Sequence, residues 1–182
     1  MGGRSTGSAP TLRVHRFPGN AAMNGPAIMI DLAAQRLSIA GDGASPRSYP
    51  VSTSALGAGE CNGSGCTPRG RHRVRLKIGS GCAAGAVFRG RRWTGEIYSD
   101  ELARCWPDRD WVLTRILWLS GLEPGRNRGG SVDTLRRFIY IHGCPPSEPM
   151  GEPRSHGCIR MRDGDLIELF DRTPVGTLVE IG

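Results

Sequence analysis

Glycine and proline interrupt this sequence so often that they argue against long helices. There are 27 glycines and 13 prolines among 182 residues. Glycine weakens the interior of helices and strands, and proline removes a backbone donor, so both residues at short intervals indicate many turns. We therefore expect short strands joined by loops rather than a helical bundle.

The apolar runs between these breaks have the length and alternation of β-strands. Residues 27–31 and 36–40 are two such runs, and the short break between them predicts a hairpin. In residues 71–76, arginines alternate with other residues, which predicts a strand with one basic face. Further strands are expected over residues 49–52, 111–119, 138–141 and 177–181.

One helix is expected near the C-terminal end. Apolar residues recur at helical spacing over residues 165–170, Asp163 is suited to the N-cap, and Pro174 would end the helix. The predicted fold is therefore mostly β, a β-sandwich or a partly closed barrel with a single helix. We expect residues 26–182 to form one domain and the Gly-, Ser- and Pro-rich residues 1–25 to form a flexible tail.

Two stretches without a clear period predict loops, residues 55–70 and 79–110. The first contains Cys61 and Cys66, for which both free thiols and a disulfide stay open. The second is long enough to form a lid over a substrate groove, although its aromatic residues would serve equally well to pin it to the sheet. These aromatic residues are Trp93, Tyr98, Trp106 and Trp111.

The charge balance favours anionic partners. Lysine and arginine number 24 against 17 acidic residues, which leaves a net charge of +7. The basic face formed by Arg71, Arg73 and Arg75 lacks interleaved aromatic residues for base stacking, so nucleic acid is not expected. No run of about 18 apolar residues predicts a membrane span, and residues 1–23 lack the apolar segment of a signal peptide.

The residues best suited to chemistry lie between positions 141 and 162. His142-Gly143-Cys144 follows a predicted strand, and Ser155-His156-Gly157-Cys158 follows a proline-rich loop. A cysteine becomes a nucleophile when a neighbouring base takes its proton, and glycine lets backbone N–H groups approach a developing oxyanion. From residue types alone three interpretations stay open: a thiol nucleophile with a histidine base, a zinc site made of both histidines and both cysteines, and ordinary packing.

The same segment resembles a known family. Residues 155–161 (SHGCIRM), with Ile141-His142-Gly143 upstream, resemble the L,D-transpeptidase catalytic domain, the YkuD family. The resemblance covers about residues 26–182, and the domain's fold would be the β-sandwich or partly closed barrel of that family, with one helix after the cysteine loop. Other segments that resemble the family's framework are residues 28–39, 49–53, 67–70 and 165–181.

The resemblance implies a role for each motif residue. Cys158 would be the nucleophile, and His142 the general base, oriented by the backbone carbonyl of Gly143. His156 and Gly157 would shape the oxyanion site. A catalytic cysteine of this kind forms a covalent intermediate and needs no metal or other cofactor.

The resemblance also implies a substrate. Ser155 and Arg160 would order the loop or contact a substrate carboxylate, and the donor would be a peptidoglycan tetrapeptide stem held as a thioester. An amine on a second stem would then form a 3→3 cross-link, with a lipoprotein lysine or a free D-amino acid as other acceptors. The protein would act in the cell envelope or periplasm, where its basic strand face could contact acidic wall polymer.

Two points depart from the family pattern or leave alternatives. Cys144 stands where the family more often has threonine, which allows a neutral substitution, a disulfide with Cys158 or an alternative nucleophile. The same chemistry could hydrolyse the stem, as an L,D-carboxypeptidase or an amidase does, instead of transferring it. A zinc-held wall-binding module without catalysis is the alternative from another class.

Overall fold

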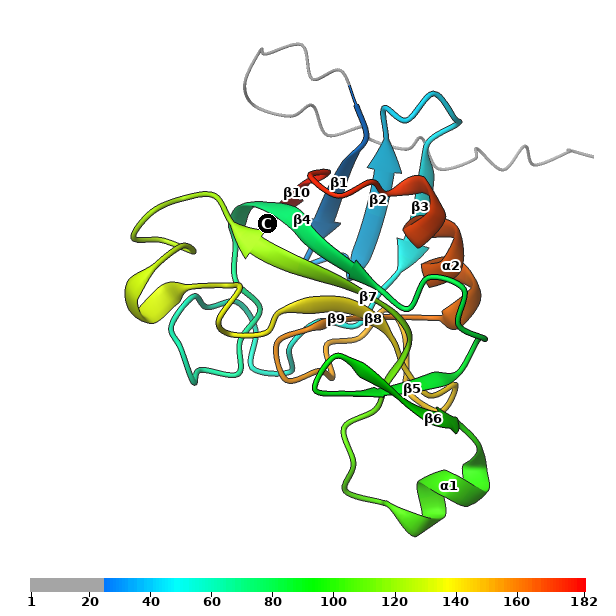
Figure 1. The fold of residues 1–182 in the computed structure, drawn as a ribbon. Helices are drawn as coiled ribbons and strands as arrows, with labels where there is room; N and C mark the ends of the chain where they lie inside the picture. The colour runs from blue at the N-terminus through cyan, green and yellow to red at the C-terminus, as the bar shows by residue number, and fades with distance from the viewer. Residues whose placement is uncertain (1–24) are drawn as a thin grey trace, which may run out of the picture.

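The computed structural model describes residues 25–182, so nearly all of the predicted tail lies outside the described residues (Figure 1). The helices are α1 (Asp100–Cys105), α2 (Asp163–Arg172) and the short 3-10 helix η1 (Gly130–Val132). The strands are β1 (Ala27–Asp31), β2 (Arg36–Ala40), β3 (Arg47–Pro50), β4 (Gly70–Ile78), β5 (Ala86–Arg89), β6 (Arg92–Ile97), β7 (Val112–Gly121), β8 (Tyr140–Gly143), β9 (Ile159–Met161) and β10 (Leu178–Ile181).

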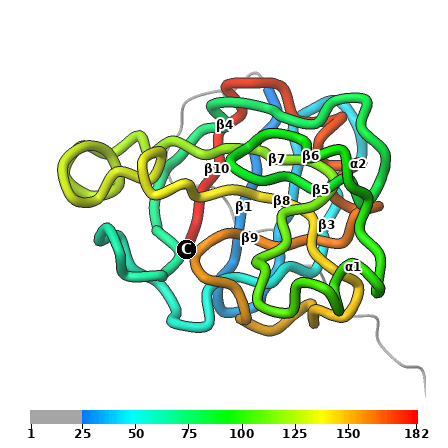
Figure 2. Tube along the Cα trace, turned by 60° about the horizontal axis from the view of Figure 1, so that its bottom comes forward, coloured from blue at the N-terminus to red at the C-terminus, as the bar shows by residue number. Residues whose placement is uncertain are grey.

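All ten strands belong to one mixed sheet, in the order β3-β2-β1-β10-β4-β7-β5-β6, with β8 paired to β7 and β9 paired to β8. The sheet curls so that β1, β2 and β3 lie on one side of the molecule and β8 and β9 on another, with α2 at the edge between them (Figures 1 and 2). The main core fills the inside of this curl with buried aliphatic side chains from both halves and from α2. The predicted mostly-β, partly closed fold is therefore confirmed.

Most of the predicted elements are present. Residues 27–31 and 36–40 form the antiparallel hairpin β1–β2. The basic alternation over residues 71–76 lies in β4, whose arginines at 71 and 75 are exposed and whose Val74 is buried. The ambiguous run from Trp111 to Leu119 is largely β7, because its side chains are packed by neighbouring strands on both sides.

Three predictions need correction. Residues 79–110 are not one long loop, since they contain the β5–β6 hairpin and α1. Strand β8 begins at Tyr140 rather than at Phe138, because Phe138 has a φ of 57°, which is incompatible with strand pairing. Helix α2 begins at Asp163 itself; its N-cap is Arg162, whose side chain makes no capping hydrogen bond.

Strands β7, β8 and β9 position the residues of the candidate site. Strand β8 pairs antiparallel with β7 and parallel with β9, so the two cysteine-histidine segments of the sequence lie side by side (Figure 2). Within residues 25–182 we find no helix with both the length and the apolar character needed to cross a membrane.

Candidate active site

The pairing of β8 with β9 brings His142 and Cys158 onto one face of the sheet. Ile141 pairs with Ile159 and His142 with Arg160, so Cys158, one residue before β9, lies beside Tyr140. Side chains alternate between faces along a strand, so His142 and Cys158 share the face opposite the buried isoleucines. With strands ~4.8 Å apart and a rise of ~3.3 Å per residue, their Cα atoms are about 8 Å apart, a separation that two side chains can bridge.

The sulfur of Cys158 is held by backbone groups at the start of β8. The Tyr140 N–H donates to Sγ at 3.4 Å, and the thiol donates to the Phe138 carbonyl at 3.4 Å. Burial raises the pKa of the Cys158 thiol to about 12, because it disfavours the thiolate. At neutral pH the thiol is therefore protonated and needs a base to become a nucleophile.

His142 has the protonation state that a general base requires. Its Nδ1 lies 2.8 Å from the carbonyl oxygen of Gly143, and because a carbonyl only accepts, Nδ1 carries the proton. The side chain is 1% exposed, and this burial lowers the pKa of His142, so the ring is neutral. Its Nε2 lone pair is then free to take a proton.

The loop before Cys158 is tightly ordered by Ser155. Its buried hydroxyl donates to the Cys158 carbonyl at 2.5 Å and accepts from the Gly157 N–H at 3.2 Å. Gly157 has a φ of 124°, and a Cβ there would approach the Cys66 carbonyl at 3.2 Å. Because the Gly157 N–H is already bonded within the loop, Gly157 contributes its backbone conformation rather than a free donor.

Thr67 supports this loop from the other side, and sequence reasoning did not assign it a role. Its hydroxyl donates to the Gly157 carbonyl at 3.0 Å and accepts from the Ser54 N–H at 3.0 Å. The position lies in the segment 67–70 that resembles the family framework, which was the available signal. A contact between residues 90 positions apart cannot be read from the sequence spacing alone.

Arg160 is engaged with protein carboxylates. Its guanidinium donates to Glu148 at 3.0 Å and to Asp110 at 2.9 Å, and it is 6% exposed. It therefore links the proline-rich loop to the segment before β7. His156 is exposed and lines a cavity of about 310 Å³ beside Arg160 and Asp110.

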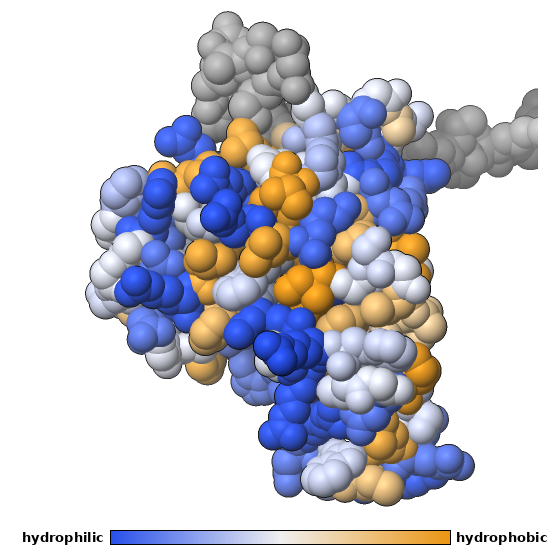
Figure 3. Space-filling view, in the orientation of Figure 1, coloured by the Kyte–Doolittle hydropathy of each residue, from blue (hydrophilic) through white to orange (hydrophobic). Residues whose placement is uncertain are grey.

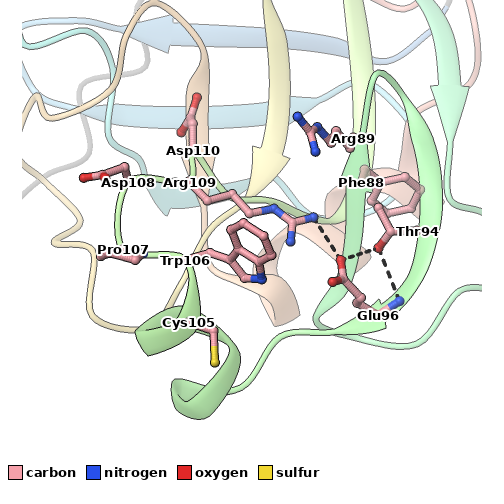
Figure 4. Close-up of a pocket in the computed structure, with 10 residues that line it drawn as sticks. All are labelled: Phe88, Arg89, Thr94, Glu96, Cys105, Trp106, Pro107, Asp108, Arg109 and Asp110. Carbon is pink, nitrogen blue, oxygen red and sulfur yellow. Dashed lines mark hydrogen bonds and ion pairs between the residues drawn. The ribbon is translucent and has the colours of Figure 1, made fainter.

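A larger cavity of about 870 Å³ shares the segment 107–110 in its lining (Figure 4). Figure 4 shows Arg109 reaching Glu96 across it, at 2.9 Å, beside Trp106. Trp106 is 57% exposed, whereas Trp111 is buried and packs edge-on against Tyr98. Trp111 and Tyr98 thus anchor this excursion, and Trp106 lines the cavity.

None of the other cysteines among the described residues forms a disulfide with Cys158. The Cys144 thiol is buried and donates to the Met161 carbonyl at 3.5 Å, and burial raises its pKa to about 11. It lies four residues along the chain from Tyr140, about 13 Å at strand spacing, which is too far for a disulfide with Cys158. Cys61 and Cys66 are free thiols.

The four residues of the zinc interpretation do not form a metal site in the structure. They are His142, Cys144, His156 and Cys158. Among residues 25–182, no group of three or more His, Cys, Asp or Glu side chains is arranged to hold a metal ion. Cys144, which directly follows β8, donates a hydrogen bond to Met161 at the end of β9, whereas His156 lines the cavity beside Arg160. The geometry supports the pair formed by Cys158 and His142 instead.

Comparison with protein families identifies a match that covers most of the chain. Residues 25–181 match the L,D-transpeptidase catalytic domain, YkuD. The Escherichia coli protein named "Probable L,D-transpeptidase ErfK/SrfK" is 45% identical over 47 residues, which are 26% of this chain and only 15% of that protein.

Solved structures of low sequence identity share the fold. An Enterococcus faecium L,D-transpeptidase is 18% identical with a TM-score of 0.52, over 87% of this chain and 50% of that one. Mycobacterium tuberculosis L,D-transpeptidase 3, solved with a faropenem-derived adduct, is 20% identical with a TM-score of 0.50, over 86% of this chain and 60% of that one.

Proposed function

The chain belongs to the family of L,D-transpeptidase catalytic domains, and from this membership we propose that it is a cysteine acyltransferase acting on peptidoglycan peptide stems. The observation that carries the proposal is the β8–β9 register, which puts Cys158 on the same face of the sheet as His142. The Nδ1 of His142 is hydrogen-bonded to the Gly143 carbonyl, so Nε2 is free to act as base. Residues 26–182 form the catalytic domain in this proposal.

The first half-reaction transfers the acyl group of the donor stem to the enzyme. His142 Nε2 takes the thiol proton while Cys158 Sγ attacks the carbonyl carbon between the diamino acid and the terminal D-residue. The tetrahedral intermediate collapses as the C–N bond breaks and the leaving amine takes the proton from His142. The D-residue departs and a thioester on Cys158 remains.

The second half-reaction releases the acyl group to an amine. The acceptor nitrogen attacks the thioester, loses a proton to His142 Nε2, and forms the new amide as the C–S bond breaks. The proton returns to Cys158, which restores the thiol. The fixed conformation of Gly157 would orient the Cys158 N–H toward the oxyanion of both intermediates, and His156 would line the approach.

The supporting residues keep this geometry rather than react. Ser155 holds Gly157 and Cys158 in the loop, and Arg160 fastens the proline-rich loop through Glu148. Their positions favour ordering over direct contact with a substrate carboxylate, because their polar atoms are already bonded within the protein. We place the reaction in the cell envelope, where peptidoglycan lies, and its product would serve cell-wall biogenesis and cell shape.

Hydrolysis of the same thioester is the second candidate outcome. Water in place of the amine would make the protein an L,D-carboxypeptidase or amidase, with an identical first half-reaction. Product analysis of stem peptides with and without an acceptor amine separates the two, since transfer yields a cross-linked product and hydrolysis a tripeptide acid. The same assay with a second stem, a lysine peptide and a D-amino acid identifies the acceptor.

A β-lactam adduct tests the nucleophile directly. Intact mass is measured after a carbapenem is added to wild type, Cys158→Ala and Cys144→Ala. One adduct that disappears only in Cys158→Ala supports the proposal, because the buried Cys144 thiol is a matched control from the same segment. An adduct that disappears only in Cys144→Ala, or none in wild type, would contradict it.

A further inference from the structure

The turn between β5 and β6 carries an arginine in an unusual backbone conformation. Gly90 and Arg91 have φ values of 54° and 66°, and they separate the paired residues Arg89 and Arg92. Two positive φ values define a type I′ turn, in which asparagine and glycine are preferred. A long side chain in this conformation is strained, and such strain persists where the surroundings hold it in place.

The guanidinium of Arg91 lies over two neighbouring aromatic rings beside the candidate nucleophile. Its guanidinium carbon is 4.8 Å from the ring centroids of both Trp118 and Phe138, and Nη1 donates to the Tyr140 hydroxyl at 3.3 Å. Phe138 and Tyr140 also supply the two backbone groups that contact Cys158 Sγ. Residues that hold Arg91 therefore also hold the thiol.

Phe138 is strained as well. Its φ of 57° is unfavourable for an aromatic residue, and its side chain is 48% exposed. This conformation turns the carbonyl toward Cys158 and the ring toward Arg91 at once. Two residues with positive φ thus meet next to the reactive sulfur, one from the turn of a hairpin and one from the start of β8.

Arg91 differs from the other arginines around Cys158 because it lacks an anionic or carbonyl partner. Arg160 is paired with Glu148 and Asp110, and Arg137 donates to the carbonyls of Gly59, Glu60 and Cys66. Within residues 25–182, no Asp or Glu lies within ion-pair distance of Arg91. Most of its five N–H donors are therefore available to a ligand.

The surroundings favour a carboxylate as that ligand. Contact with the rings of Trp118 and Phe138 restricts the guanidinium. The planar fork of its N–H donors matches the two oxygens of a carboxylate. Figure 3 shows strongly hydrophilic residues in the part of the face where Figure 1 places the β5–β6 hairpin, next to apolar residues at the centre. A partly apolar wall strengthens a charged hydrogen bond.

We propose that Arg91 is a specificity-determining residue that binds a carboxylate of the donor peptide while Cys158 attacks it. The inference rests on the proposed function, since the donor stem is its ligand. Two carboxylates of such a stem qualify: the terminal one on the leaving D-residue and the side-chain one on the diamino acid. The terminal carboxylate lies next to the scissile bond, whereas the other lies at the far end of the diamino acid's side chain.

The experiment compares free-carboxylate stems with stems amidated at one or the other carboxylate. Wild type, Arg91→Gln and Arg92→Gln are assayed for kcat/KM. Arg92 is the matched control, because it is exposed in the same hairpin and its replacement changes the net charge equally. Arg91→Gln should lower kcat/KM for the free-carboxylate stem about 30-fold, whereas one of the two carboxamide stems should change little. The stem that is insensitive identifies the carboxylate that Arg91 binds.

If Arg91 had only a structural role, the variants would change kcat/KM in a different pattern across the three stems. Equal losses for all stems, or no loss, would overturn the inference. Arg91→Lys, which keeps the cation and loses the planar fork, should retain part of the preference, and thermal melting checks that each variant is folded.

Binding separates this inference from the proposed function. Calorimetric titration of Cys158→Ala, with and without Arg91→Gln, measures affinity for the three stems without turnover. A carboxylate preference that depends on Arg91 supports the inference even if wild type transfers no stem, which would refute the proposed function alone. Absence of that preference refutes the inference alone.

Discussion

Because the Cys158 thiol is protonated at rest, alkylating reagents should modify it at a measurably lower rate. A rise in thiol pKa from the ordinary 9.0 to about 12 lowers the thiolate fraction at pH 7.5 about a thousandfold. A more basic thiolate is also more nucleophilic. With a Brønsted coefficient of about 0.45, the thiolate of Cys158 reacts roughly 20-fold faster than an ordinary thiolate, which offsets part of that loss. We therefore expect iodoacetamide to modify Cys158 about 50-fold more slowly than a thiol of ordinary pKa.

The assay is site-resolved mass spectrometry of alkylated protein, with the exposed Cys105 followed in the same sample as the accessible control. The rate at Cys158 should rise about tenfold per pH unit from 8 to 10.5 without a plateau. Restricted access alone would slow the reaction but leave a plateau above pH 9. A plateau, or a neutral-pH rate equal to that of Cys105, would refute the reasoning and indicate a thiolate–imidazolium pair instead.

Three further variants test the loop before Cys158 and one buried histidine. Ser155→Ala should lower the free energy of unfolding by about 2 kcal/mol in urea titration, because it leaves the Gly157 N–H and Cys158 carbonyl without their partner, whereas the exposed Ser131→Ala should be neutral. Burial lowers the pKa of His72 to about 4 from 6.5, so the unfolded chain binds more protons between these values. Stability should therefore fall by about 3 kcal/mol as pH drops from 6.5 to 4, and His72→Gln should flatten that slope; an unchanged slope would contradict the assignment. Gly157→Ala should slow carbapenem acylation about a hundredfold, since it displaces the loop, while Gly151→Ala, also at a positive φ but in open space, should leave the rate unchanged.

Local patterns were sufficient to predict much of the fold. The alternation in residues 27–31 and 36–40 predicted the first hairpin, because the buried and exposed faces of a strand repeat every two residues. The helix near residue 165 followed from apolar spacing of three and four, and Leu166 and Leu169 are indeed buried. Such hydrophobic periods involve only a few neighbouring residues, so they predict the same element wherever its apolar face can pack against a core.

The excursion from 79 to 110 could not be predicted in the same way. Its β6 strand is exposed along almost its whole length, so no hydrophobic period marks it. Strand β5 is short and buried by β7, a partner that lies more than 20 residues later. The start of β8 was misplaced for a similar reason, since the positive φ of Phe138 is imposed by contacts and not by its own preference.

The sequence by itself determined which reactive groups this protein has, and the resemblance carried by residues 141–161 indicated how they combine. Only the tertiary structure decided their state, because burial depends on residues that arrive from distant strands. It keeps His142 neutral and Cys158 protonated, and it commits Ser155 to the loop. It also brings Arg91, from 67 positions upstream, to the residues that hold the nucleophile.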